Sequence, residues 1–434
     1  MFLGLMLAAL IASTFAREHA FDPRLWGESG VLVSDHAEGQ YCPTVATAGE
    51  LTVAAWQDDR GVDPDIAIAV LGADGEVVRE RVFTRAGVQT RPVIAGRWLV
   101  FVESANGADW SVVGLRLADL DRGTDSLVVI ADTPGAKPEV VAEVTAHGEL
   151  IVAWIADSDT GGRALRGAII GQNDRSPVRF PIVNTFGTVM DLHMAVNHDL
   201  VFFAWTDWSG VEPTITSQCV DLEHRLRTFG PAGLVLTRGY WAWYPHVVPS
   251  DQGYGAFTWV ERQPSGEARV VYQIVDYQSN FRFWNPIGVT DWSLDMTETD
   301  TAPFMEGGVI VAAAERDFGS DRLTAHALDF NGARVWETLV SDLGFRVRDA
   351  RAVSNGLTSW ITWRDERFGA STTFAARLDA SGNNTWQPMG TAVARTGGNQ
   401  WSPAPHLAAT NHLIVSWTDE REVETPRIGL QKMK

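Results

Sequence analysis

The chain has 434 residues, and its 54 acidic and 35 basic side chains give a formal net charge of −19. A hydrophobic fraction of 45% excludes a disordered chain, and the strong negative charge argues against binding to nucleic acid, whose phosphates it would repel. Two cysteines cannot build a disulfide framework or a cysteine-rich zinc module, whereas 18 tryptophans are unusually many.

The first sixteen residues have the pattern of a signal peptide. Segment 1–16 reads MFLGLMLAALIASTFA, has no charged side chain and is too short for a membrane-spanning helix. Ser13 and Ala16 are the small residues expected before a cleavage point, although a buried N-terminal helix is the alternative. We therefore predict a signal peptide over 1–16 and an exported domain over 17–434, which is secreted, periplasmic or at the cell surface. No other stretch is apolar enough to span a membrane, and we expect a monomer.

A tryptophan-centred segment recurs along the rest of the chain. Its first copy is LTVAAWQDDR, and later copies include ELIVAWIADSD, LVFFAWTDWSG and LIVSWTDER. Six copies have an anchor tryptophan at the same position: Trp56, Trp154, Trp205, Trp259, Trp363 and Trp417. In two degenerate copies Val102 and Ala313 take the anchor position. The eight anchors lie about 50 residues apart, which is typical of a repeat architecture.

Each copy follows one internal pattern of four short runs. The copies open near a proline: Pro43, Pro92, Pro138, Pro245, Pro303 and Pro403. The anchor run follows, then a polar turn, a third run, and a glycine-containing turn such as ADG, FNG or ASG before the fourth run. The runs alternate apolar and polar residues and are rich in β-branched and aromatic side chains, which indicates strands. Four antiparallel strands per repeat predict an all-β, eight-bladed β-propeller, with seven blades as the alternative.

The two ends of the chain share a pattern that predicts how the ring closes. Segment 26–43 reads WGESGVLVSDHAEGQYCP, and segment 386–403 reads WQPMGTAVARTGGNQWSP. The last copy stops after its third strand. We therefore predict that the N-terminal segment supplies the missing outer strand of the last blade, which also removes an exposed sheet edge.

The W-x-D-x-R copies, each followed by an x-D-x-x-G hairpin, resemble the repeats of exported bacterial β-propeller proteins. The resemblance covers the whole mature chain and implies the fold, not a function. The chain lacks the Gly-His opener of WD40 repeats and the S-x-D-x-G-x-T-W box of sialidases. Because the Trp, Asp and Arg recur in most blades, we interpret them as structural residues that fill and cap the blades.

Function is expected where the copies differ, and they differ after the opening proline. Lined up on the anchors, the inner-strand residues at this position are Thr44, Val93, Glu139, His193, His246, Phe304, Arg351 and His406. Three histidines and a carboxylate, His193, His246, His406 and Glu139, are the candidate catalytic set and could also hold a divalent metal. The alternative is that each histidine packs between blades, and we expect no cofactor.

A second irregular cluster is aromatic. GYWAWYPH places Trp241, Trp243 and Tyr244 in one segment, and Tyr41 and Trp401 take matching places in the first and last blades. Aromatic faces ringed by carboxylates suit sugar rings, although packing between blades is the alternative. With Arg351 these aromatic residues form the predicted ligand-binding set.

These residues favour non-catalytic recognition of a glycan or a partner protein on the channel face. A carbohydrate-active lyase or hydrolase that uses the histidines is the first alternative. A structural scaffold in a surface assembly is the second.

Overall fold

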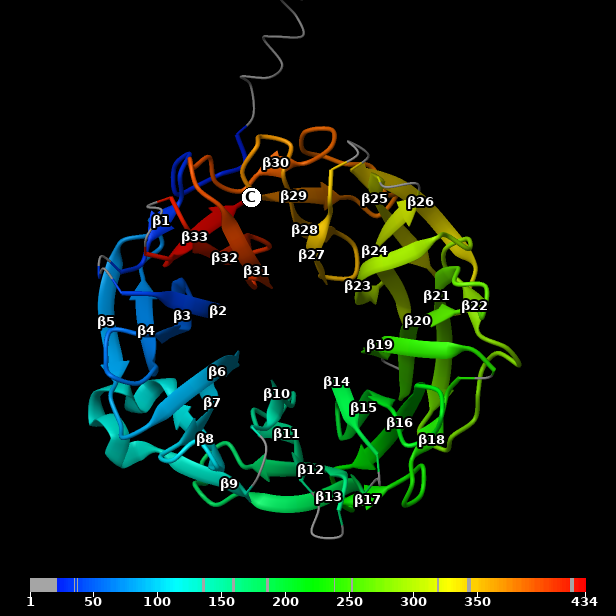
Figure 1. Cartoon of the computed structure of the whole chain (residues 1–434), viewed down its shortest axis with the longest axis horizontal. Coiled ribbons are helices and arrows are strands. Elements are labelled where there is room, and N and C mark those ends of the chain that lie inside the picture. Colours follow the sequence, from blue (N-terminus) through cyan, green and yellow to red (C-terminus); the bar gives the residue numbers. More distant parts are fainter. Residues whose placement is uncertain are drawn as a thin grey trace, which may run out of the picture.

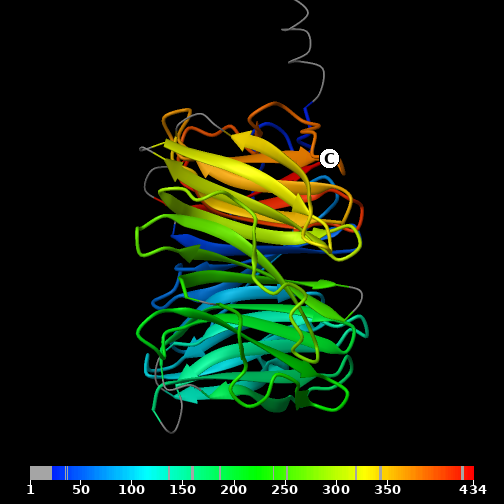
Figure 2. The same ribbon diagram turned by 90° about the vertical axis from the view of Figure 1, so that its right-hand side faces the viewer.

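A computed structural model describes residues 22–434, except 35, 37, 135–136, 158–160, 185–186, 238, 251–252, 318–319, 342–344 and 422–424. The predicted signal peptide lies outside these residues. Eight antiparallel sheets form a ring around a central axis (Figure 1). Seen edge-on, their strands run from one face of the ring to the other (Figure 2). The predicted eight-bladed propeller is confirmed, and the seven-bladed alternative is wrong.

Each blade contains four strands, ordered from the axis outwards. The innermost strands are β2 (Gln40–Ala48), β6 (Val88–Ala95), β10 (Glu139–Val144), β14 (Val189–Asn197), β19 (Trp241–Ser250), β23 (Asp295–Phe304), β27 (Arg348–Ser354) and β31 (Gln400–Leu407). The second strands are β3 (Leu51–Asp58), β7 (Trp98–Ser104), β11 (Leu150–Asp157), β15 (Leu200–Asp207), β20 (Tyr254–Arg262), β24 (Gly308–Asp317), β28 (Ser359–Asp365) and β32 (Leu413–Asp419).

The two outer layers are less regular. The third strands are β4 (Asp65–Leu71), β8 (Asp109–Arg116), β12 (Arg163–Ile170), β16 (Thr214–Asp221), β21 (Ala268–Asp276), β25 (Ser320–Leu328), β29 (Thr372–Leu378) and β33 (Arg427–Met433). The outermost strands are β5 (Val77–Phe83), β9 (Val128–Pro134), β13 (Val178–Asn184), β17 (Leu226–Arg227), β22 (Ile287–Gly288), β26 (Arg334–Ser341), β30 (Thr391–Ala392) and β1 (Val31–Leu32). A further two-residue strand, β18 (Leu234–Val235), pairs with β16.

The ring closes through its N-terminal segment, as predicted. β1 pairs antiparallel with β33 of the last blade, with Val31 opposite Leu430. Trp26, just before β1, donates a hydrogen bond from Nε1 to the carbonyl of Ala73 in the first blade at 3.1 Å. The closing strand therefore joins both sides of the seam between the last and first blades.

The hydrophobic core consists of layers between neighbouring blades. The second strands are buried on both faces because each blade packs against two neighbours. At the seam, for example, Trp56 and Leu71 of the first blade pack with Ile414 and Leu430 of the last. All six anchor tryptophans are at most 3% exposed, so they belong to this core.

Besides strands, the described part of the chain contains one short 3-10 segment, Leu117–Ser126. It connects the third and fourth strands of the second blade. Among the described residues, no helix is long and apolar enough to cross a membrane.

Candidate functional site

The repeated Trp, Asp and Arg side chains bind one another. Trp363 Nε1 donates to Asp365 Oδ2 at 3.0 Å, and Arg367 Nε donates to Asp365 Oδ1 at 2.9 Å. The same contacts recur within two further sets: Trp56, Asp58 and Arg60, and Trp417, Asp419 and Arg421. These polar groups are satisfied within their own blade, in agreement with the structural interpretation.

One position on the innermost strands distinguishes four consecutive blades. On the second strand of each blade, one residue comes directly before the anchor. The position meant here is the inner-strand residue that pairs with it. The pairs are His193 with Ala204, His246 with Thr258, Asp300 with Ala312, and Arg351 with Thr362. Blades four to seven therefore place two imidazoles, a carboxylate and a guanidinium at equivalent places.

The alignment of the copies misplaced this position in three blades. Phe304 pairs with Gly308 at the far end of β23, and Asp300 occupies its expected place. In the third blade Val141 occupies the position, two residues after Glu139. In the last blade Ala404 occupies it, two residues before His406. An alignment on the anchors that allows gaps misses Asp300, which lies 13 residues before Ala313, because the pairing with the second strand sets the register.

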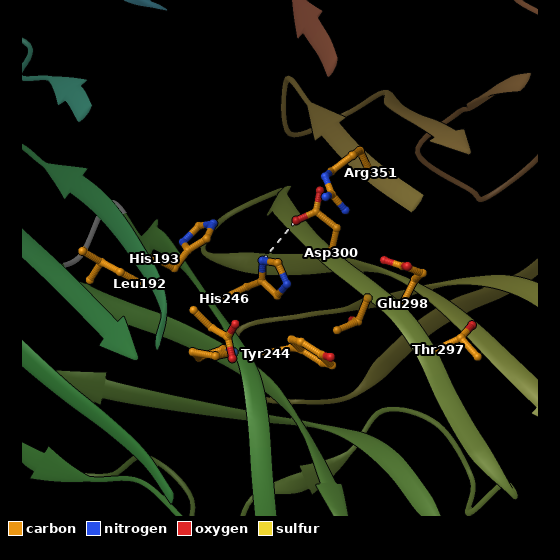
Figure 3. A pocket seen from close by; sticks show the side chains of 11 residues that line it. Leu192, His193, Tyr244, His246, Thr297, Glu298, Asp300 and Arg351 are labelled. Atoms are coloured by element: carbon orange, nitrogen blue, oxygen red, sulfur yellow. Dashed lines mark ion pairs between the residues drawn. The ribbon is translucent and has the colours of Figure 1, made fainter. Parts of the chain in front are cut away.

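The four side chains converge on one place (Figure 3). His246 Nδ1 lies 3.1 Å from Asp300 Oδ1, and the rings of His193 and His246 meet edge to face with centroids 5.0 Å apart. Asp300 Oδ2 accepts a hydrogen bond from the Ala352 backbone N–H at 2.8 Å. Arg351 is exposed beside Asp300 in the same view.

These contacts assign different proton positions to the two histidines. His193 Nδ1 accepts the Val247 backbone N–H at 3.3 Å, so the proton of a neutral His193 is on Nε2. His246 Nδ1 faces a carboxylate oxygen, so in the neutral ring Nδ1 holds the proton and Nε2 has the lone pair. His193 is thus a hydrogen-bond donor through Nε2, and His246 is a base through Nε2.

The charges around the pair support this assignment. Burial, and to a lesser extent the nearby His246, lower the pKa of His193 to about 3, so His193 is neutral. Burial alone would raise the pKa of Asp300, but His246, Arg351 and the Ala352 N–H together hold that pKa below its ordinary value. Asp300 is therefore ionised and orients His246.

A cavity of about 550 Å³ opens beside the dyad. It is lined by Asp191, Leu192, His193, Tyr244, Pro245, His246, Thr297, Glu298, Thr299, Asp300 and Arg351. The pKa of Tyr244 is raised by burial and by the charges of Asp191 and Glu298, so its hydroxyl keeps its proton. Burial also raises the pKa of Glu298.

His406 and Glu139, the other two predicted catalytic residues, do not line this cavity. His406 Nε2 lies 3.1 Å from Thr47 Oγ1 across the seam between the last and first blades. Glu139 Oε1 accepts the Leu192 backbone N–H at 3.0 Å. Both residues connect neighbouring blades, and the structure brings only His193 and His246 of the predicted set together.

The predicted ligand-binding aromatics differ in exposure. Tyr244 and Trp241 are 47% and 48% exposed, and Tyr41 of the first blade is 36% exposed. Trp243 and Trp401 are covered by guanidinium groups, those of Arg262 at 5.2 Å and Arg364 at 4.3 Å from the ring centroids. Of the predicted set, Tyr244 and Arg351 line the cavity.

No three His, Cys, Asp or Glu side chains among the described residues are arranged to hold a metal ion. In the pocket, His193 Nδ1 is occupied by a backbone N–H and His246 Nδ1 faces Asp300. The geometry therefore gives no support to the metal hypothesis within this part of the chain.

Comparisons with known proteins bear on the fold. No family model and no curated protein matches the chain. Among solved structures, the polysaccharide lyase Uly1 aligns with a TM-score of 0.51 and 9% identity over 81% of this chain and 90% of its own.

Two further solved structures align more loosely. The propeller domain of the trilobed protease from Pyrococcus furiosus gives a TM-score of 0.47 and 10% identity over 82% of this chain and 99% of its own. The dihydro-heme d1 dehydrogenase NirN gives a TM-score of 0.45 and 15% identity over 82% of this chain and 68% of its own. At these identities the similarity shows the propeller fold alone.

Proposed function

We propose that the protein is an exported carbohydrate-active propeller that cleaves a uronate-containing polysaccharide by β-elimination in the pocket of blades four to seven. The observation that carries the proposal is the His246–Asp300 dyad, which directs Nδ1 to the carboxylate and leaves Nε2 as a base. His246 lines the cavity, so a ligand there can reach its Nε2.

The pocket contains the other groups that this reaction needs. His246 Nε2 takes the proton from C5 of the uronate, and the C4–O4 bond breaks as the C4=C5 double bond forms. The leaving glycosidic oxygen takes the hydroxyl proton of Tyr244, which its raised pKa keeps in place. Arg351 is exposed and has no carboxylate within ion-pair distance among the described residues, so it can neutralise the uronate carboxylate and stabilise the anion formed at C5.

Non-catalytic recognition of a glycan or a partner protein is the second candidate. The half-exposed rings of Trp241 and Tyr244 favour it, since such rings stack on sugars without any chemistry. Both candidates use the same pocket and differ only in whether a bond is broken.

The decisive experiment incubates the purified protein with a panel of uronate polysaccharides and follows the ultraviolet absorbance of the unsaturated product. We expect turnover, with a loss of about 1000-fold in His246→Ala and about 100-fold in Asp300→Asn. Glu143→Gln is the matched control, because Glu143 also accepts an inner-strand backbone N–H, from Val196, but lies outside the cavity. Its activity should equal that of the wild type.

The same panel separates the alternatives. Binding without turnover on every polysaccharide would contradict the enzymatic proposal and support the recognition module. No binding to any glycan would contradict both the lyase and glycan recognition, and would leave recognition of a partner protein or the scaffold role.

A further inference from the structure

A pair of cations lies outside the proposed catalytic pocket: Arg91 on the innermost strand of the second blade and Lys137 just before that of the third. Arg91 of β6 has a positive φ of 54° at the bulge between Thr90 and Val93. Asp191 and Tyr244 have the same conformation at the same bulge of their strands, and both line the pocket. Arg91 therefore lies at the level of the pocket, on the face of the ring where the innermost strands begin, which we call the entry face.

Lys137 lies beside Arg91, just before the innermost strand of the third blade. Its Nζ donates to Thr90 Oγ1 at 3.2 Å and lies 5.5 Å from the ring centroid of Trp110. Arg91 Nη1 donates to the Pro138 carbonyl at 3.5 Å, one residue from Lys137. These contacts hold the two cationic groups together at the boundary between the second and third blades.

No carboxylate lies within ion-pair distance of either cation in the part of the chain that the structure describes. Some arginines elsewhere in the ring do have such a partner, as Arg60 has Asp58 and Arg367 has Asp365. The pKa of Lys137 is lowered by burial and by the charge of Arg91, so the two cations repel each other. The nearby carboxylate of Glu139 is engaged by the Leu192 backbone N–H.

The pair has no neighbouring carboxylate to neutralise it, although acidic side chains outnumber basic ones in this chain by 54 to 35. Two neighbouring cations with free donors favour a ligand anion, because a charge-assisted hydrogen bond to each would remove their repulsion. Arg91 is exposed and Lys137 is half-buried, so both are reachable from the entry face.

We propose that Arg91 and Lys137 form an anion subsite that binds a carboxylate or sulfate group of the polysaccharide, away from the bond that is cleaved. Blade three adjoins blade four, so a chain lying across the entry face would reach from this subsite to the pocket (Figure 1). The inference rests on the proposed function for its substrate and deepens it, since it specifies a polyanion with charges on more than one sugar unit.

The test measures calorimetric affinities for three oligosaccharide types of similar length: neutral, uronate-containing and sulfated. We expect the wild type to bind the charged types about 10-fold tighter than the neutral one. The double variant Arg91→Gln, Lys137→Gln should lose the preference for the sulfated type and keep for the uronate type only the share that Arg351 supplies. The double variant Arg97→Gln, Lys432→Gln is the matched control. This control removes the same charge at the opposite face of the ring. Arg97 lies in the turn between β6 and β7, and Lys432 of β33 pairs with Ile414, near the turn between β31 and β32.

The outcomes separate this subsite from the proposed function. Preference for the uronate type identifies a carboxylate, and preference for the sulfated type identifies a sulfate ester. Turnover with equal affinity for neutral and charged chains overturns the subsite alone. Charge preference that Arg91→Gln, Lys137→Gln abolishes, without turnover, keeps the subsite and overturns the lyase. If the control variant lost the charge preference as much as Arg91→Gln, Lys137→Gln does, the preference would depend only on the net charge of the protein. That result would overturn the subsite.

Discussion

Carboxylates have two different roles in this ring, and the contacts of each carboxylate determine its role. Asp58 is bound by Trp56 and Arg60 of its own blade, and equivalent aspartates repeat this pattern in the last two blades. Asp300 instead binds His246 of the preceding blade and the Ala352 N–H of the next. A repeated contact stabilises the fold, whereas the contact made once forms the site.

Asp58 allows a test of the repeated contact through pH. Burial alone would raise its pKa, but the donors Arg60 and Trp56 hold that pKa below the ordinary value. Its ionised form therefore stabilises the folded state above the unfolded carboxyl pKa of about 4, and this contribution is lost as the pH falls through the folded pKa. Asp58→Asn should lower the free energy of unfolding at pH 7 by about 2 kcal/mol, and the loss of stability towards acid should be shallower than in the wild type.

Urea unfolding at several pH values measures both effects. Asp63→Asn, in the exposed turn that follows, is the control and should track the wild type. If the curves for Asp58→Asn and the wild type stayed parallel over the whole range from neutral to acid pH, the assigned role would be contradicted.

At the scale of the element, the outer strand of a blade has to fit over the anchor tryptophan. In the seventh blade Gly390 has a φ of 87°, and a Cβ there would lie 2.2 Å from the Trp363 ring. Gly30 has the same relation to Trp417 in the last blade, where a Cβ would lie 2.8 Å from the ring. The repeat therefore pairs a large anchor with a glycine on the outer strand, and the shared motif of segments 26–43 and 386–403 reflects this packing.

Gly390→Ala should destabilise the fold by about 3 kcal/mol, because it adds a steric clash to the cost of a positive φ. Gly369→Ala is a close control, since Gly369 also has a φ of 87° but a Cβ added there would meet no atom within 4 Å. Its expected cost is about 1 kcal/mol, from the backbone alone. Equal losses for the two variants in thermal or urea unfolding would show that the indole does not require the glycine.

At the scale of the whole molecule, stability depends on a closed ring. Each blade buries its faces against two neighbours, so the seam between the last and first blades is as necessary as any other. Trp26 is 7% exposed and packs in the core layer of this seam, whereas Trp284, in the outer part of the fifth blade, is 81% exposed.

Trp26→Ala should therefore lower the free energy of unfolding by about 4 kcal/mol, through lost packing and an opened seam. Trp284→Ala removes the same side chain from the surface and should cost less than about 1 kcal/mol. Denaturant unfolding of both variants measures the difference. If the two losses proved similar, the closing strand would not hold the ring together.

How much of the site was predictable follows from the same geometry. His193, His246, Tyr244 and Arg351 could be named because they depart from the repeat at identifiable positions. Asp300 and Glu298 were missed, because β23 has its bulge between Met296 and Glu298 and its proline near the far end of the strand. The opening proline is therefore a poor register mark in that blade.

The sequence by itself indicated eight blades with seven as the alternative, the closing strand, and the structural role of the repeated Trp, Asp and Arg. These features are encoded locally and repeat about every 50 residues, so comparing copies is enough to find them. Only the tertiary structure decided which inner-strand side chains meet. The dyad joins residues of different blades, and bulges shift each inner strand against its neighbour. A shift of one residue turns a side chain to the other face of its strand, so spacing along the chain cannot replace the three-dimensional register.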